Sequence, residues 1–260
     1  MNTASFWKGT AQEVSFSSLS QDLDTDVAII GGGITGITAA HLLAQAGKSV
    51  VVLEAMKVGL GTTGHSTGNL HVTVDQSLSA IRNTWDQKTA TAVARSRSET
   101  IDAIERVVAE YNIPCNFFRR PHYIFPTDSS QVPQMEQEYR TLRDAGVDAT
   151  IIREVPLPFR VEQALRIEHQ AQFHPLMYVR MLAKAIATDR CRIFEDSKVI
   201  EIDDDRMTVS TAHGKVRAEA IIMAMHTPKG FNVLQTELGP YREYGIAARL
   251  TDDRYPEGLF

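Results

Sequence analysis

A glycine-rich turn between two apolar runs constrains the fold of this chain more than any other feature. Residues 26–30 read Asp-Val-Ala-Ile-Ile, a pattern typical of a buried parallel strand. A Gly-x-Gly-x-x-Gly turn at 31–36 follows directly, and a helical segment at 37–47 ends in glycine. Residues 48–54, Lys-Ser-Val-Val-Val-Leu-Glu, predict a second buried strand. The sequence therefore predicts one complete strand–helix–strand unit of an α/β fold.

The residues of this unit suit the binding of a dinucleotide. Gly31 allows the tight turn, and Gly33 has no side chain that would block a pyrophosphate group. Gly36, together with the small Ala40, lets the helix pack close to the sheet. The helix N-terminus offers N–H groups and a partial positive charge to the phosphates. Glu54 ends the second strand, where its carboxylate can accept hydrogen bonds from both ribose hydroxyls.

The segment after Glu54 separates two classes of dinucleotide. A simple NAD-binding domain would continue with another short βαβ unit, whereas residues 59–69 read GLGTTGHSTGN. Residues 26–55 and this segment together resemble the FAD signature of the D-amino acid oxidase superfamily, whose members are FAD-dependent amine and amino-acid oxidoreductases. Its glycine/sarcosine-oxidase-like enzymes, and a subgroup with a C-terminal Rieske domain, are the most similar. An NAD-dependent dehydrogenase stays open as an alternative. The resemblance continues more loosely through HPLMYVRMLAKAIA, CRIFEDSKVIEID and AEAIIMAMHTP.

The resemblance implies FAD as the cofactor and gives roles to residues beyond the glycine turn. Glu54 would hold the adenosine ribose, and the loop threonines and serine would approach the pyrophosphate and ribityl chain. Val199 would present backbone groups to the adenine, and Ala224, with the residue after it, would pass close to the cofactor. Core packing of the strands is the alternative for these last positions. The implied cofactor-binding residues are Gly31, Gly33, Gly36, Glu54, Thr62, Thr63, His65, Ser66, Val199 and Ala224.

His65 has two open interpretations. Some amine dehydrogenases of this superfamily carry a histidine at this place that bonds covalently to the flavin 8α-methyl group. The corresponding segment, 63–68, reads Thr-Gly-His-Ser-Thr-Gly here. A neutral imidazole beside an electron-poor flavin ring could form that bond. The alternative is a histidine that only hydrogen-bonds the flavin or the backbone.

Residues that contact the substrate are less sharply defined than those of the cofactor site, and the catalytic residues stay open. Tyr241 and Arg242 begin the last predicted strand, 241–250, in the part of the chain that the family uses for substrate. The planar guanidinium of an arginine suits a substrate carboxylate, because it can bind both oxygens. A structural role for the pair is the alternative.

The composition argues against several other functions. The 260 residues carry 32 acidic and 27 basic side chains, a net charge of −5, and this balance argues against nucleic acid as a partner. No apolar run approaches the ~20 residues that a membrane span needs. The first 26 residues lack the pattern of a secretory signal. Cys115 and Cys191 form no metal or redox motif, so the sequence predicts a cytoplasmic protein with reduced thiols and no metal site.

We expect an α/β fold in which a Rossmann-like FAD-binding domain accompanies a discontinuous, incomplete α+β substrate domain. Apolar periodicity predicts one helix over 77–111. Residues 115–127 predict a strand pair around a solvated turn at 119–122. The predicted domains are an N-terminal arm at 1–25, the FAD-binding domain at 26–112 and 175–227, and the substrate domain at 113–174 and 228–260.

The last part of the chain bears on the expected activity. In the family, a final strand and helix bring a glycine-containing loop to the flavin, and residues 228–260 contain no such loop. We therefore expect an N-terminal fragment, a truncated product or one half of a split enzyme. The predicted activity is oxidation of the C–N bond of a small amine or amino acid, with hydride passing to flavin and an imine as product. The alternative is a catalytically silent FAD-binding fragment or subunit that needs a completing chain or a homo-oligomer.

Overall fold

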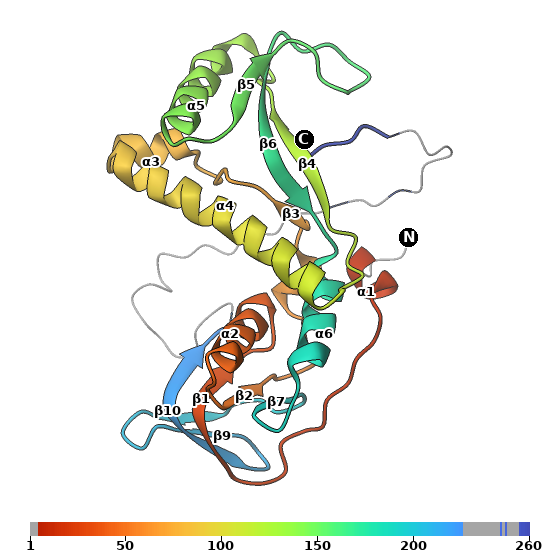
Figure 1. Cartoon of the computed structure of the whole chain (residues 1–260), viewed down its shortest axis with the longest axis vertical. Coiled ribbons are helices and arrows are strands. Elements are labelled where there is room, and N and C mark those ends of the chain that lie inside the picture. Colours follow the sequence, from red (N-terminus) through yellow and green to blue (C-terminus); the bar gives the residue numbers. More distant parts are fainter. Residues whose placement is uncertain (1–4, 226–244, 246–247, 249–254) are drawn as a thin grey trace. The chain divides into compact units, whose positions relative to one another are not determined.

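The chain forms two compact units in a computed structural model that describes residues 5–225, 245, 248 and 255–260 (Figure 1). The first unit comprises Met1–Ser66 and Pro175–Arg249, and the second comprises Thr67–His174 and Leu250–Phe260. The chain therefore leaves the first unit after residue 66, builds most of the second, and returns at residue 175.

A six-stranded mixed sheet forms the centre of the first unit. Its strand order is β7-β2-β1-β10-β9-β8, in which β7, β2, β1 and β10 are parallel and the β10-β9-β8 part is antiparallel. A hairpin turn at residues 213–214 connects β9 to β10. The strands are β1 (Leu23–Ile30), β2 (Val50–Leu53), β7 (Cys191–Phe194), β8 (Glu201–Asp203), β9 (Thr208–Ser210) and β10 (Lys215–Met223).

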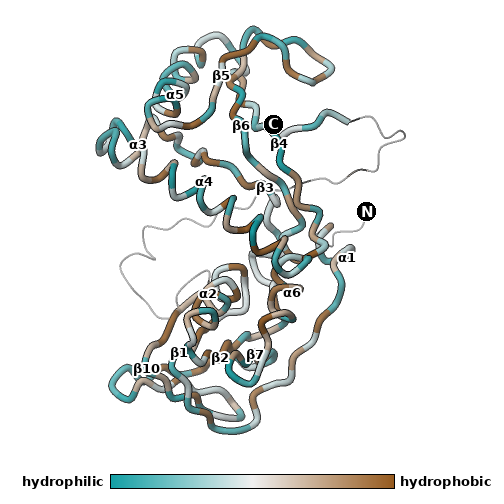
Figure 2. Tube along the Cα trace, viewed as in Figure 1, coloured by the Kyte–Doolittle hydropathy of each residue, from teal (hydrophilic) through white to brown (hydrophobic). Residues whose placement is uncertain are grey.

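Apolar side chains cover both faces of this sheet. The residues of β2 are hydrophobic (Figure 2), and all four are buried, as expected for a parallel strand that is covered on both faces. On one face Ile29 lies against α2 (Ile34–Gln45), which packs beside α6 (Pro175–Ile186). On the other face Ala28 and Ile30 join a core cluster with Leu19 and Val199. Each fully buried large aliphatic side chain stabilises the unit by roughly 1.5–3 kcal/mol.

A four-stranded antiparallel sheet forms the centre of the second unit. Its central strand β6 (Ala164–Gln172) pairs with β3 (Asn69–Leu70), β4 (Phe118–Ile124) and β5 (Ala149–Ile152). The helices α3 (Leu78–Thr84), α4 (Gln87–Glu110) and α5 (Val132–Asp144) pack against one another, and the short helix η2 (Ser129–Gln131) precedes α5. Their shared core includes Val72, Leu78, Leu142, Leu165 and Ile167.

The single helix predicted over 77–111 is wrong, because the structure divides it into α3 and α4 at Trp85. Asp86 starts the second helix, and its carboxylate accepts the N–H of Thr89 at 2.6 Å. Such a cap satisfies an amide that has no acceptor within the helix.

The strand pair predicted over 115–127 is also wrong, because β4 runs straight through the Arg-Arg-Pro sequence. Pro121 is accommodated at a register shift between Arg120 and His122, where a missing N–H is tolerated. Arg119 is held rather than solvated, since its guanidinium pairs with Asp102 at 2.6 Å and also with a second acidic side chain of α4.

The unit boundary differs from the predicted domain boundary. Residues 67–112 belong to the second unit, although the sequence places them with the cofactor domain. The physical reason is packing, because α3 and α4 bury their apolar sides against α5 and β6. The segment that begins at residue 67 thus builds the second unit.

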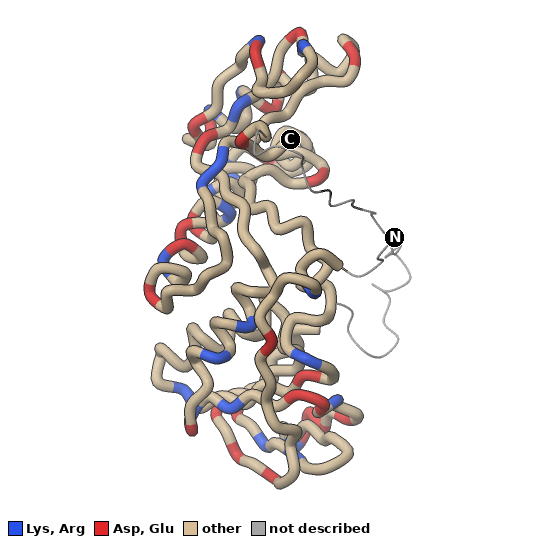
Figure 3. Tube along the Cα trace, turned by 90° about the vertical axis from the view of Figure 1, so that its right-hand side faces the viewer, with Lys and Arg blue, Asp and Glu red and all other residues tan. Residues whose placement is uncertain are grey.

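Charged residues of both signs are interspersed along the described chain (Figure 3). None of the described helices is long and apolar enough to cross a membrane. Within the same described residues, no group of three or more histidine, cysteine or acidic side chains is arranged to hold a metal ion.

Candidate functional site

The carboxyl ends of the four parallel strands form one edge of the first unit's sheet, where ligands bind in open α/β folds. The chain order reverses between β1 and β10, so the loops after these strands flank a topological switch point. Gly31 follows β1 with φ +113°, and a Cβ atom there would lie 2.8 Å from the Ala224 carbonyl oxygen. The predicted positions 31 and 224 therefore meet at this edge, and glycine is required at the first of them.

The other two glycines of the turn differ in what surrounds them. A Cβ atom at Gly36 would lie 1.9 Å from the Gly31 carbonyl oxygen, so this glycine permits the contact between α2 and β1. Among the residues that the structure describes, a Cβ atom at Gly33 would meet only the Thr63 hydroxyl within 4 Å, at 3.2 Å. Gly36 thus serves the packing of the protein itself. Gly33 borders a space that the neighbouring protein atoms leave largely unfilled.

Glu54 is fixed beside this turn. Its Oε2 accepts the N–H of Gly32 at 2.7 Å, and its Oε1 accepts the N–H of Met56 at 2.8 Å. The side chain is half-buried, and each carboxylate oxygen has a second lone pair for another donor. Two hydroxyl groups on neighbouring carbons would match these acceptors.

The loop after β2 returns to the start of α2 through the short helix η1 (Thr62–His65). Thr63 is buried, and its hydroxyl accepts the N–H of Ile34 at 3.1 Å. The next amides of the first turn of α2 lack acceptors within the helix, which leaves this end suited to an anion. By contrast, Thr62, His65 and Ser66 are exposed.

Comparison with known proteins identifies the dinucleotide. Residues 26–257 match the family model described as FAD dependent oxidoreductase. The chain belongs to this FAD-dependent oxidoreductase family. The family's cofactor is FAD, and the acidic side chain, the unfilled glycine position and the open helix end fit its ribose and pyrophosphate groups.

Several relatives cover most of the chain. It is 29% identical over 259 residues to YhfW of Bacillus subtilis, which carries the name of a Rieske 2Fe-2S iron-sulfur protein, covering 98% of this chain and 51% of YhfW. It is 29% identical to the gamma-glutamylputrescine oxidoreductase of Escherichia coli, and the match covers 86% of this chain and 54% of that protein. Glycine oxidase from Geobacillus kaustophilus shares the fold with a TM-score of 0.66 and 21% identity. The match covers 78% of this chain and 55% of the glycine oxidase chain. The chain spans about half the length of these relatives.

The remaining predicted site residues have different outcomes. Val199 lies before β8 with its side chain buried in the core cluster, and a role for its backbone toward adenine stays a prediction. The covalent bond at His65 also stays a prediction. Tyr241 and Arg242 lie outside the described residues.

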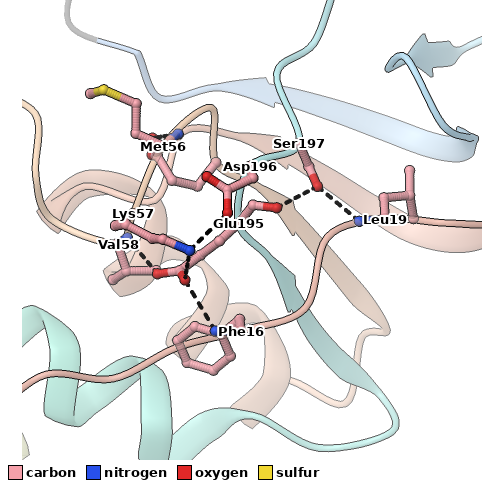
Figure 4. Close-up of polar contacts among 9 residues, drawn as sticks. Phe16, Leu19, Met56, Lys57, Val58, Glu195, Asp196 and Ser197 are labelled. Atoms are coloured by element: carbon pink, nitrogen blue, oxygen red, sulfur yellow. Dashed lines mark hydrogen bonds and ion pairs between the residues drawn. The ribbon is translucent and has the colours of Figure 1, made fainter.

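Sequence reasoning missed Glu195, which follows β7 as Glu54 follows β2. The register pairs Leu53 with Phe194, so the two glutamates occupy equivalent positions on adjacent strands. Glu195 is fully buried and contacts the loop after β2 (Figure 4). The sequence signal that could have found Glu195 is an acidic residue at the end of an apolar strand, as at Glu54.

Replacing Glu54 tests the proposed ribose contact. Glu54→Ala is expected to weaken FAD binding by about tenfold or more, since a hydrogen bond to a charged acceptor contributes roughly 1.5–3 kcal/mol. Quenching of FAD fluorescence on titration into apoprotein measures the Kd. Glu219→Ala, at an exposed position of β10, is the control. A wild-type Kd for Glu54→Ala would remove this residue from the site.

The second unit partly buries a pair of histidine side chains, His71 and His122, whose ring centroids are 4.8 Å apart. Burial and the neighbouring His71 lower the pKa of His122 to about 4. Burial and Arg97 also lower the pKa of His71. The folded protein therefore binds fewer protons than the unfolded chain below the ordinary histidine pKa. Stability is lost as the pH falls from about 6.5 toward 4.

This linkage predicts how a histidine variant responds to acid. Between pH 7 and pH 4.5, the free energy of unfolding is expected to fall less in His122→Gln than in the wild type. The difference should be about 1–2 kcal/mol, a value reduced to allow for the partial exposure of the histidine. Urea unfolding at the two pH values measures the difference. His213→Gln, at an exposed hairpin position, should lose as much as the wild type. An equal loss in His122→Gln and the wild type would contradict a depressed pKa.

Proposed function

We propose that this chain binds FAD across its glycine turn and serves the oxidation of the C–N bond of an amine or amino acid. The observation that carries the cofactor part is the orientation of Glu54 beside a turn whose central glycine borders unfilled space. The substrate class is supported by the sequence-matched relative named gamma-glutamylputrescine oxidoreductase and by the fold shared with a glycine oxidase.

The chain's own residues would hold and orient the cofactor. Glu54 would accept hydrogen bonds from the ribose diol, and Gly33 would leave the pyrophosphate path clear. Thr63 fixes the loop against the start of α2, whose N-terminal end favours negative charge. When bound, FAD would supply the two-electron acceptor for the oxidation of an amine to an imine. Arg242 would bind a carboxylate on an amino-acid substrate.

Anaerobic reduction tests this function. The protein reconstituted with FAD is mixed with primary amines, secondary amines and amino acids, and the visible flavin absorption is followed. We expect bleaching by at least one amine and none by the matching alcohol. Failure to bind FAD, or preferential binding of NADH, would overturn the proposal. Colour retained in acid-precipitated protein, with the flavin mass on a peptide that spans residues 64–68, would indicate the covalent bond at His65, and flavin released to the supernatant would exclude it.

A second candidate is a catalytically silent flavin-binding subunit that requires a partner chain. The likeness to YhfW favours it, because that relative carries the name of an iron–sulfur protein rather than of an oxidase. In the same experiment such a subunit would bind FAD, and no substrate of the panel would bleach it. Bleaching by an amine in a monomeric preparation would exclude this candidate.

A further inference from the structure

A buried carboxylate joins three separate segments of the first unit. Glu195, at the end of β7, is fully buried. Its Oε1 accepts the N–H of Val58 at 2.8 Å, and its Oε2 accepts the N–H of Phe16 at 3.1 Å (Figure 4). The ammonium of Lys57 lies 3.3 Å from Oε2. A buried charge is retained at such a place only when it is paired and hydrogen-bonded, and this one is both.

The residues beside Glu195 bind the same two segments. The N–H groups of Asp196 and Ser197 donate to the carbonyls of Met56 and Glu54 at 2.9 and 2.8 Å. The hydroxyl of Ser197 accepts the N–H of Leu19 at 2.9 Å. Residues 195–197 therefore attach the segment 11–22, called the N-terminal segment below, to residues 55–66, called the cofactor loop.

The cofactor loop connects the two ends of the FAD site. It begins beside Glu54, whose Oε1 accepts the N–H of Met56, and it includes Thr63, whose hydroxyl accepts the N–H of Ile34. Midway, the N–H of Gly59 donates to the Gly32 carbonyl at 3.0 Å. A shift of the backbone at residue 58 would therefore move the ribose acceptor and the threonine together.

Residues 5–10, which precede the N-terminal segment, also contact the far end of the cofactor loop. Ser5 donates its hydroxyl hydrogen to the Gly64 carbonyl at 2.5 Å, and the indole N–H of Trp7, in α1 (Phe6–Thr10), donates to the Ser66 carbonyl at 2.7 Å. The cofactor loop is thus attached to residues 5–22 at both of its ends, and Glu195 supplies the buried attachment.

From these contacts we infer that Glu195 is a positioning residue for flavin binding, in addition to holding the fold. This inference rests on the proposed FAD site. A purely structural carboxylate would affect the stability of the unit and leave FAD affinity unchanged. A positioning carboxylate affects FAD affinity as well, because it fixes the loop on which Glu54 and Thr63 depend.

The second unit offers a matched control for this distinction. Glu138 is also buried, at 5% exposure, and its carboxylate accepts the N–H groups of Leu78 and Ser79 at 2.9 and 2.7 Å. Glu138→Gln and Glu195→Gln therefore make the same chemical change to a carboxylate that binds two backbone amides. Only the second change touches the cofactor loop.

The test measures the FAD Kd and the Tm of the apoprotein for the wild type and both variants. Glu195→Gln is expected to raise the FAD Kd by about tenfold. Glu138→Gln is expected to lower the Tm and to leave the Kd within about twofold of the wild type. A wild-type Kd for Glu195→Gln, or equal Kd changes in both variants, would overturn the inference.

A second variant keeps the test decisive if Glu195→Gln does not fold. Lys57→Met removes the half-exposed ammonium that lies 3.3 Å from Glu195 and 2.7 Å from Asp196, and it is expected to raise the Kd by about threefold. An unchanged Kd would then count against the inference. A wild-type protein that does not bind FAD would instead overturn the proposed function together with the inference, so the two failures are distinguishable.

Discussion

Gly36→Ala is expected to prevent the first unit from folding, although alanine is the better helix former. The added Cβ atom would lie 1.9 Å from the Gly31 carbonyl oxygen. That oxygen cannot move away easily, because Gly31 itself packs against the Ala224 carbonyl. The intrinsic gain of alanine over glycine in a helix is only ~1 kcal/mol, whereas this clash should cost at least about 3 kcal/mol.

The effect is measured by soluble expression and by urea unfolding followed by circular dichroism. Gly9→Ala is the matched control, because Gly9 also lies in a helix and a Cβ atom there would meet nothing within 4 Å. It should be neutral or slightly stabilising. A wild-type unfolding midpoint in Gly36→Ala would show that α2 does not pack on β1 as closely as the structure has it.

The local signals of the sequence predicted the first βαβ unit well. Its apolar runs and glycines act through neighbouring residues, so β1, α2 and β2 appear close to their expected bounds. The break between α3 and α4 was missed, because the apolar periodicity lies within α4 and only the cap at Asp86 marks where that helix begins. Pro121 suggested a turn, whereas the register shift in β4 accommodates it within a strand.

In the site, too, features set by residues close in the sequence were predicted, and contacts between distant residues were missed. The roles of Gly31 and Gly36 in the turn, and the place of Glu54 beside it, follow from short spacing, and the geometry agrees. Glu195 was missed, because its partners Val58 and Phe16 are 137 and 179 residues away in the sequence. Contacts of this kind depend on the pairing of β7 beside β2, which sequence spacing does not show. Sequence spacing therefore predicts which groups would contact the cofactor, and the fold shows what holds them.

Gly33→Val is expected to give a folded protein that has lost FAD. At this position a Cβ atom would meet only the Thr63 hydroxyl, at 3.2 Å, and a side-chain hydroxyl can rotate away. The backbone has φ −80°, which valine tolerates. The γ-methyl groups would instead occupy the space over the start of α2 that the pyrophosphate requires.

The expected loss for Gly33→Val is at least about a hundredfold in FAD affinity, equivalent to ~3 kcal/mol. The bound flavin per chain after gel filtration and the Kd from FAD titration both measure it, and Gly33→Ala should fall between the wild type and Gly33→Val. Gly9→Val is the control, since open space surrounds that glycine. Because Gly33→Val keeps the fold, its loss of flavin separates cofactor binding from folding, which Gly36→Ala cannot do. A yellow Gly33→Val protein with wild-type flavin content would mean that the cofactor does not lie over this turn, and the site would have to be sought elsewhere.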